Sequence, residues 1–189
     1  DKIIHFRRQR VNIALIGYGY WGPNIAKNIF TNHKLSLHSI CDLRQVRLDK
    51  AFNSYKNSTY YETDYQKLLS NQEIQAIAIA VETSSHYQIA KDALNKGKHI
   101  YIEKPFTSTV QEAIDLARLA ENKGLTIHVN HIMMYHPCIR KIKDLIDNNE
   151  LGEILYFEAM RMNLGQIKKD VSAMADLAIH DLSIIDYLS

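Results

Sequence analysis

The chain has 189 residues, enough for one ordinary domain with part of a second and for a sizeable buried core. Hydrophobic residues make up 46% and charged residues 23%, values typical of globular proteins that disfavour disordered, collagen-like and coiled-coil classes. The formal net charge of +2 is too small to indicate a nucleic-acid partner. We interpret the basic cluster Arg7, Arg8 and Arg10 as a solvated arm.

The cysteine content and the length of the apolar runs indicate the cellular compartment of the protein. The two cysteines, Cys41 and Cys138, provide no disulfide framework and are typical of a reducing compartment. No apolar stretch approaches the roughly 20 residues needed to span a bilayer. Charges near the N-terminus stand where a signal peptide would have its apolar core. We therefore expect a cytoplasmic protein without a membrane partner.

Short apolar runs alternate with segments of helical periodicity over most of the chain. The strand-like runs are Val11 to Ile16, Leu35 to Cys41, Ala76 to Val81, His99 to Ile102 and Leu125 to Val129. This alternation predicts a parallel sheet with helical crossovers. The run from Ala76 to Val81 is apolar at every position, which is typical of a central strand covered on both faces.

Two of the crossover helices have recognisable ends. Thr83 or Ser84 is suited to begin a helix that Gly97 ends, and Thr109 is suited to cap a helix running through Glu121. The apolar residues of the second helix share one predicted buried face: Ala113, Leu116, Ala117 and Ala120. With right-handed crossovers, these elements predict an α/β fold, a Rossmann-like doubly wound parallel sheet with its ligand site at the carboxyl ends of the strands.

The pattern changes after about Val129. A helical segment from Ile139 to Ile146 precedes the strand-like run Glu153 to Met162, and a helix-like tail begins at Ala175. We therefore predict a Rossmann-like domain over residues 1–131 and, over residues 132–189, the beginning of a second, α+β domain. One strand cannot form a sheet, so we expect this second domain to be truncated.

A glycine-rich turn follows the first strand. The sequence Gly17-Tyr18-Gly19-Tyr20-Trp21-Gly22 lies between an apolar strand and a helix, the context that a dinucleotide-binding turn requires. Its three glycines suit a tight turn, the approach of a pyrophosphate and close packing of helix on strand, in that order. The following helix N-terminus offers N–H groups to phosphates. The motif predicts a nicotinamide dinucleotide site; an ordinary strand-to-helix turn is the alternative.

An acidic residue ends the second strand. Asp42 stands 25 residues after Gly17, close to the roughly 20-residue offset at which a carboxylate binds the adenosine ribose hydroxyls. This spacing favours NAD over NADP. Arg44, two residues later, is the alternative, because it could receive the 2′-phosphate of NADP. A surface acid or helix cap is the other interpretation of Asp42.

A lysine follows the fourth of these predicted strands. Glu103-Lys104-Pro105 comes directly after the run His99 to Ile102, which places Lys104 on the ligand side of the sheet. An ammonium there can stabilise the alkoxide that develops as hydride leaves its carbon. From the residues alone, a solvated Lys–Glu ion pair is an equal alternative.

An acid and a histidine are spaced by one helical turn near the end of the chain. Asp176 and His180 share a helix face, where the imidazole can accept a hydroxyl proton and the carboxylate can orient it. A surface Asp–His pair is the alternative. Asp181 leaves open which acid points inward.

The segment from His128 to Cys138 contains several nitrogen and sulfur side chains. Its spacing matches no standard zinc pattern, so we predict no metal site. Asn130 and His131 follow another strand, and we favour a substrate- or cofactor-facing role for both.

Four of these motifs together resemble the glucose–fructose oxidoreductase/inositol dehydrogenase (Gfo/Idh/MocA) family, from about Val11 to the end of the chain. They are the glycine turn continued by Pro23 and Asn24, the segment Thr83 to Ala93 with His86, Glu103-Lys104-Pro105, and Asp176-x-x-x-His180. The resemblance implies a Rossmann domain followed by an open antiparallel sheet. It implies that Lys104, Asp176 and His180 are catalytic, and that Thr83, His86 and Glu103 lie along the cofactor. The Trp-Gly-Pro-Asn form of the turn is similar to members that act on nucleotide-linked sugars.

The chain also departs from that family's pattern. Val171 to Ala175 stand where a glycine-rich lead into the Asp–His helix is usual, and members are commonly nearly twice this long. We expect an NAD-dependent oxidoreductase, with NADP less favoured, acting on a secondary hydroxyl or the matching ketone of a sugar or sugar nucleotide and forming a homo-oligomer at full length. The alternatives are an NAD-using glycoside hydrolase and a cofactor-binding fragment or sensor without turnover.

Overall fold

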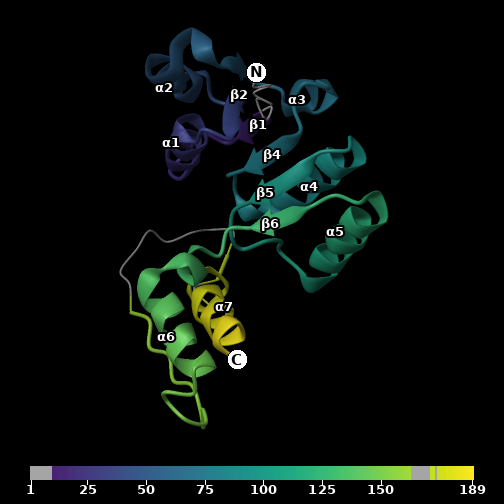
Figure 1. Ribbon diagram of the computed structural model, residues 1–189. Coiled ribbons are helices and arrows are strands. Elements are labelled where there is room, and N and C mark those ends of the chain that lie inside the picture. The colour runs from purple at the N-terminus through teal and green to yellow at the C-terminus, as the bar shows by residue number, and fades with distance from the viewer. Residues whose placement is uncertain (1–9, 163–170, 173) are drawn as a thin grey trace, which may run out of the picture.

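The computed structural model describes residues 10–162, 171–172 and 174–189. Arg7 and Arg8 therefore lie outside the described residues. The centre of the fold is a parallel sheet with the strand order β3-β2-β1-β4-β5-β6 (Figure 1). Its strands are β1 (Val11–Ile16), β2 (Leu35–Cys41), β3 (Tyr60–Glu62), β4 (Ala76–Ile79), β5 (His99–Ile102) and β6 (Ile127–Val129). The five predicted strands are confirmed, although β4 ends at Ile79 rather than Val81 and β6 begins at Ile127 rather than Leu125. The three-residue β3 is an additional strand at the edge.

Helices connect the strands and cover the sheet. They are α1 (Gly22–Thr31), α2 (Gln45–Tyr55), α3 (Tyr65–Ser70), α4 (His86–Asn95), α5 (Val110–Lys123), α6 (Pro137–Asp147) and α7 (Ile179–Leu188). Figure 1 shows α1 and α2 on one side of the sheet, α4 and α5 on the other, and α6 and α7 side by side beyond its carboxyl edge.

The side chains of the central strands alternate between two cores. From β1, Ala14 and Ile16 pack with α3, α4 and α5, whereas Leu15 packs with α1 and α2. From β4, Ile77 and Ile79 join the first core and Ala78 joins the second. This alternation explains the continuous apolar run, because a strand covered on both faces needs apolar side chains at every position.

The strand order places a crevice at the carboxyl edge of the sheet. The strand β1 pairs with β2 on one side and with β4 on the other, so the chain winds outward from β1 in both directions. The connections after β1 and β4 therefore leave on opposite faces, which opens a crevice at their carboxyl ends. The glycine turn and the segments that follow β4, β5 and β6 all begin at this edge.

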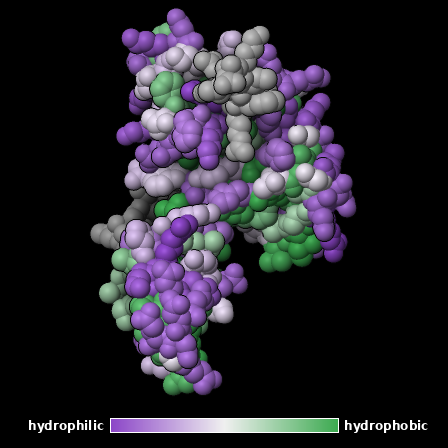
Figure 2. All heavy atoms as spheres, in the orientation of Figure 1, coloured by the Kyte–Doolittle hydropathy of each residue, from purple (hydrophilic) through white to green (hydrophobic). Residues whose placement is uncertain are grey.

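The helix ends differ in part from their predicted positions. Thr109 caps α5 in a reciprocal arrangement with Glu112, as expected from its position, and Gly124 ends the helix with φ of 63°. The helix α4 starts only at His86, because a 3₁₀ turn occupies Thr83–Ser85. The predicted buried face of α5 was wrong at Ala117, which is exposed. Figure 2 shows an apolar area of surface over the first turns of this helix.

The region after β6 has little core. Among its described residues only Asn130, directly after the strand, and Leu188 are buried. The predicted strand from Glu153 to Met162 was wrong, because these residues form no strand and most of them are exposed. A strand requires a hydrogen-bonded neighbour, and the described residues supply none for this segment. No helix in the described parts of the chain combines the length and apolar character that crossing a membrane requires.

Candidate active site

The glycine turn has a backbone that other residues would not permit. Gly17 has φ of 98°, and a Cβ there would collide with the carbonyl oxygen of Ala80. A Cβ at Gly22 would collide with the Gly17 carbonyl, so α1 can approach the strand only because this side chain is missing. Among the described residues, a Cβ at Gly19 would collide with nothing and would contact only the Arg47 guanidinium, 3.4 Å away. Gly17 and Gly22 therefore occupy the predicted turn and packing positions, whereas the approach of a pyrophosphate at Gly19 stays a prediction.

The start of α1 fits an anionic group. No side-chain hydrogen bond caps this helix, its first turn has no acidic residue, and Pro23 occupies its first turn. The positive dipole end of the helix thus faces the turn, with no acidic residue of its first turn to compete for an anion. Tyr20 and Trp21 are 85% and 36% exposed beside it, with ring centroids 6.4 Å apart. This cradle suits the pyrophosphate of a dinucleotide.

Asp42 joins the end of β2 to the glycine turn. Its Oδ2 accepts a hydrogen bond from the Tyr18 N–H at 2.8 Å and one from the Arg47 guanidinium at 3.1 Å. Its Oδ1 accepts the Arg44 N–H at 2.9 Å, and the residue is only 5% exposed. Arg44 contributes its backbone here, while its side chain is exposed. Contact of either residue with a ribose stays a prediction.

Glu103 joins three segments of the site. Its carboxylate accepts a hydrogen bond from the Asn130 amide at 2.7 Å and one from the Trp21 indole. Burial raises the pKa of Glu103 above its usual value, and these hydrogen bonds oppose the rise. Asn130 is itself 7% exposed. The glycine turn and the ends of β5 and β6 are thereby held together around one carboxyl group.

His86 braces the loop that carries Lys104. Its imidazole is 1% exposed, with Nδ1 3.0 Å from the Pro105 carbonyl oxygen and Nε2 3.2 Å from the Val81 carbonyl oxygen. Thr83 is also buried, at 6% exposed. The resemblance placed both along the cofactor. The contacts of His86 with Pro105 and Val81 instead indicate that it holds together the loops after β4 and β5.

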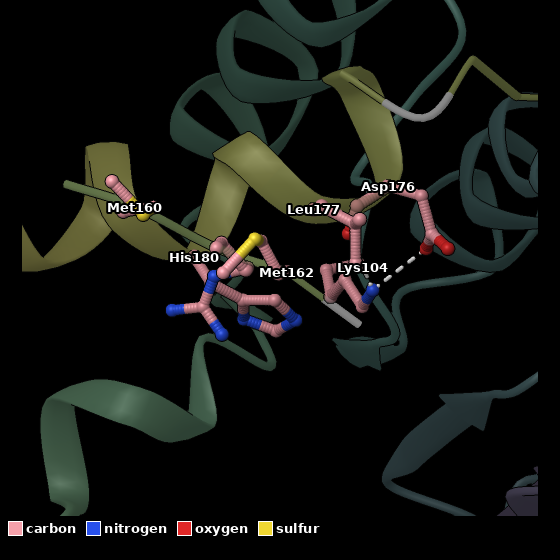
Figure 3. Close-up of a pocket in the computed structure, with 7 residues that line it drawn as sticks. Lys104, Met160, Met162, Asp176, Leu177 and His180 are labelled. Carbon is pink, nitrogen blue, oxygen red and sulfur yellow. Dashed lines mark hydrogen bonds and ion pairs between the residues drawn. The ribbon is translucent and has the colours of Figure 1, made fainter. Parts of the chain in front are cut away.

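Lys104 and Asp176 meet although 72 positions separate them. The Lys104 ammonium donates hydrogen bonds to Asp176 Oδ1 at 2.8 Å and to the Asp176 carbonyl oxygen at 2.9 Å (Figure 3). The two side chains are 17% and 19% exposed. An ammonium has three N–H donors, so this geometry leaves one for a further oxygen.

Asp176 and His180 come from two different helical forms. Asp176 belongs to a π-helical turn, Met174–Ala178, and His180 to the first turn of α7. The widened turn replaces the α-helix that the sequence predicted from Ala175, a distortion that often occurs at functional sites. Both side chains nevertheless line the pocket of Lys104 (Figure 3).

Arg161 distinguishes Asp181 from Asp176. Its guanidinium makes a bidentate ion pair with Asp181, with Nε 2.9 Å from Oδ2 and an Nη 2.6 Å from Oδ1. The hydrogen bonds from Arg161 lower the pKa of Asp181 below its usual value. Asp181 thus pairs with Arg161 of the segment from Glu153 to Met162, and Asp176 pairs with Lys104.

These residues border a pocket of about 560 Å³. Its lining residues are Lys104, Met160, Arg161, Met162, Asp176, Leu177 and His180. Burial, followed by the positive charge of Lys104, lowers the pKa of His180 below its usual value. A neutral imidazole therefore stands beside an ammonium in a half-buried pocket, an arrangement suited to accepting a proton from a hydroxyl group.

Sequence analysis missed two arginines of this site. Arg47 lies on α2 between Asp42 and Gly19, and Arg161 lies in the pocket. A signal existed for Arg161, because a cation within the apolar run from Ile154 to Met162 needs a partner. Arg47 follows Asp42 by five positions, a spacing that indicates contact only once α2 is known to begin at Gln45.

The strand order and the glycine turn define the class of Rossmann-fold, dinucleotide-binding proteins. A sequence model of the oxidoreductase family with an NAD-binding Rossmann fold matches residues 11–131, more than half of the chain. The chain belongs to this family, the Gfo/Idh/MocA oxidoreductases, and the cofactor of its Rossmann domain is NAD.

Known relatives include sugar and inositol dehydrogenases. The UDP-N-acetylglucosamine 3-dehydrogenase of Acidithiobacillus ferrooxidans is 34% identical over 59% of this chain and 35% of that protein. The scyllo-inositol 2-dehydrogenase (NAD(+)) of Bacillus subtilis is 26% identical over 95% of this chain and 54% of that protein. The crystal structure of scyllo-inositol dehydrogenase from Lactobacillus casei with NAD(H) and scyllo-inositol superposes with a TM-score of 0.81 at 19% identity, over 96% of this chain and 56% of that one. The chain thus spans about half the length of such relatives.

Proposed function

We propose that this chain supplies the cofactor site and reacting groups of an NAD-dependent dehydrogenase. Its substrate would be a secondary hydroxyl of a sugar, cyclic polyol or sugar nucleotide, or the matching ketone in the reverse direction. The observation that carries the proposal is the Lys104–Asp176 contact at 2.8 Å, beside His180, in a pocket at the carboxyl edge of an NAD-binding sheet.

In this mechanism each residue has one task. His180, neutral because its pKa is lowered, accepts the proton of the substrate hydroxyl. The remaining N–H of Lys104 donates a hydrogen bond to the same oxygen and stabilises its negative charge as hydride leaves the carbon. Asp176 orients the ammonium through its carboxylate and carbonyl oxygens. Bound NAD⁺ supplies the hydride acceptor.

The names of relatives support the substrate class. One relative is named for UDP-N-acetylglucosamine and another for scyllo-inositol, and both names describe oxidation of a hydroxyl-bearing ring. By the same analogy, we propose that residues 132–189 begin a substrate-binding and oligomerisation region.

The first test is Lys104→Met, which removes the charge and keeps most of the side-chain length. Turnover with sugar or polyol substrates should fall about 100- to 1,000-fold, as expected when one oxyanion donor is lost. The affinity for NAD, measured by titration calorimetry, should change little. Lys96→Met, at an exposed lysine just after α4, is the matched control. Equal turnover in the two variants would refute the role of Lys104.

Product analysis separates this function from its two rivals. A dehydrogenase accumulates NADH with a polyol, whereas a glycoside hydrolase that oxidises its sugar transiently releases product without net NADH. NAD binding without conversion of any sugar tested would favour a cofactor-binding module or sensor. Among the described residues the segment from Glu153 to Met162 has no neighbouring strand, and this observation favours that last outcome.

A further inference from the structure

His131 lies between the sheet and the helix that bears His180. It follows β6, where its N–H donates a hydrogen bond to the Val129 carbonyl oxygen at 2.8 Å and closes a tight turn. Its neighbour Asn130 is held by Glu103, the residue before Lys104. The 3₁₀ turn that follows, Ile132–Tyr135, packs against α7. These contacts place the backbone of His131 at the border between sheet and pocket.

Two imidazoles share an unusual property at this border. Nδ1 of His131 and Nδ1 of His180 are both buried, and neither has a hydrogen-bond partner among the described residues. Buried polar atoms almost always have partners, so such an exception requires an explanation. His180 lines the pocket, and a ligand there is the natural partner for its nitrogen. The same explanation applies to His131 if its ring faces the same ligand.

The causes of two pKa shifts support a position of His131 near the pocket. Burial, then the nearby His128 and Lys104, lower the pKa of His131 below its usual value. His131 in turn contributes to the lowered pKa of His180. His131, His180 and Lys104 are therefore close enough to act on one another's charge. A neutral imidazole in this position can donate or accept a single hydrogen bond through Nδ1, depending on its tautomer.

We propose that His131 is a second imidazole of the substrate site, which hydrogen-bonds a hydroxyl on the carbon next to the one that exchanges hydride. The inference rests on the proposed function, because Lys104 and His180 are then occupied by the reacting oxygen. Sugars and cyclic polyols carry a further hydroxyl on the neighbouring carbon. His131 follows β6 and His180 belongs to α7, so the two imidazoles would meet a shared ligand from different elements. His131 would thus select vicinal diols over simple alcohols.

The first experiment tests the geometry without requiring turnover. Histidine ring nitrogens, labelled with ¹⁵N, are titrated by NMR in the full chain and in Lys104→Met. Removing a cation should raise the pKa of each imidazole that faces it, so the His131 and His180 signals should both titrate at higher pH in the variant. The exposed His33, in the turn after α1, provides the reference signal. If only His180 responds, His131 does not face the site and the proposal is wrong.

The second experiment tests the ligand. Scyllo-inositol and UDP-N-acetylglucosamine are added to the NAD-loaded chain, and binding is measured for wild type, His131→Gln and the control His128→Gln. Loss of one hydrogen bond should weaken binding about three- to tenfold in His131→Gln. NAD affinity should be unchanged, and His128→Gln should bind like wild type, because His128 is exposed and stacks on Tyr101.

The outcomes separate this inference from the proposed function. If His131→Gln binds both probes as wild type does while Lys104→Met loses turnover, the role of His131 is refuted and the dehydrogenase assignment stands. If neither probe binds and no polyol is converted, both proposals fail together. A loss of probe binding confined to His131→Gln, with the ¹⁵N response described above, would establish the second imidazole.

Discussion

Residues 11–131 and residues 132–189 differ in how completely they pair their strands and bury their side chains. In the first region every strand of the sheet has its neighbours within the chain, and helices bury side chains of the central strands on both faces. In the second, α6 buries none of its residues, and the extended segment from Glu153 to Met162 has no paired neighbour among the described residues. Local sequence preference makes a helix, but a sheet requires partners that are distant in sequence.

The candidate site lies where these two regions meet. Lys104 comes from the well-packed sheet, whereas Asp176, His180 and Arg161 come from the region with little core. Polar contacts, rather than a shared apolar core, therefore bring the site together. Regions with few buried contacts open more readily than packed ones. We therefore expect Arg161, Asp176 and His180 to be more mobile than Lys104.

The largest difference in the free energy of unfolding is expected between two glycine substitutions, one at Gly17 and one at Gly124. Gly17→Ala should cost about 2–4 kcal/mol, because it adds a backbone collision with Ala80 to an unfavourable positive φ. Gly124→Ala, which has a positive φ but open space, should cost about 1 kcal/mol. Urea unfolding measures both, and NAD binding should be lost only in the first. Equal costs would show that the turn yields to a methyl group.

Core truncations compare the two regions directly. Ile79→Ala removes a fully buried side chain of β4 and should cost about 2–5 kcal/mol. Ile142→Ala removes a side chain of α6 that is 37% exposed, and it should cost less than about 1 kcal/mol. The measurement is again the urea midpoint at constant slope. Similar costs would mean that α6 contributes to a common core.

The Arg161–Asp181 pair should restrain the extended segment. Arg161→Met should weaken its attachment to α7 by about 1 kcal/mol, so that limited proteolysis within residues 150–162 becomes roughly fivefold faster. Lys143→Met, which breaks the more exposed Lys143–Asp147 pair within α6, is the control and should leave the cleavage rate unchanged. Cleavage rates that match between the two variants would contradict a restraining role for Arg161.

The smallest expected effect is a dependence of stability on pH. Folding lowers the pKa values of His131 and His180, so below about pH 6.5 the unfolded chain takes up protons that the folded chain does not. Stability should therefore fall as pH drops below about 6.5 and level off below the folded pKa values. Each histidine contributes less than about 1.4 kcal/mol per pH unit.

The double variant His131→Gln/His180→Gln isolates this effect. Its free energy of unfolding, measured by urea titration between about pH 7.5 and 5.5, should decline less steeply than that of the wild type. Identical slopes would show that neither imidazole is held in its neutral form. The same lowered pKa places the acidic limb of turnover below about pH 6.5, if His180 is the base.

The sequence alone determined the features that depend on local pattern. The apolar runs located five strands, and the spacing of Gly17, Gly19 and Gly22 located the tight turn between β1 and α1, because neighbouring residues dictate these preferences. Position after a strand was also enough to single out Lys104 and Asn130 as residues at the carboxyl edge, since all parallel strands end there.

Only the tertiary structure decided which of these residues meet. Sequence spacing favoured Asp176 but left open which of Asp176 and Asp181 points inward, and the fold pairs Asp176 with Lys104 and Asp181 with Arg161. It turned Asp42 toward the Tyr18 N–H and Arg47, and it replaced a predicted α-helical turn at Asp176 with a π-helical one. It also left Glu153 to Met162 without a strand neighbour among the described residues, despite a strand-like pattern. Contacts between distant segments depend on the packing of the whole chain, which local periodicity does not encode.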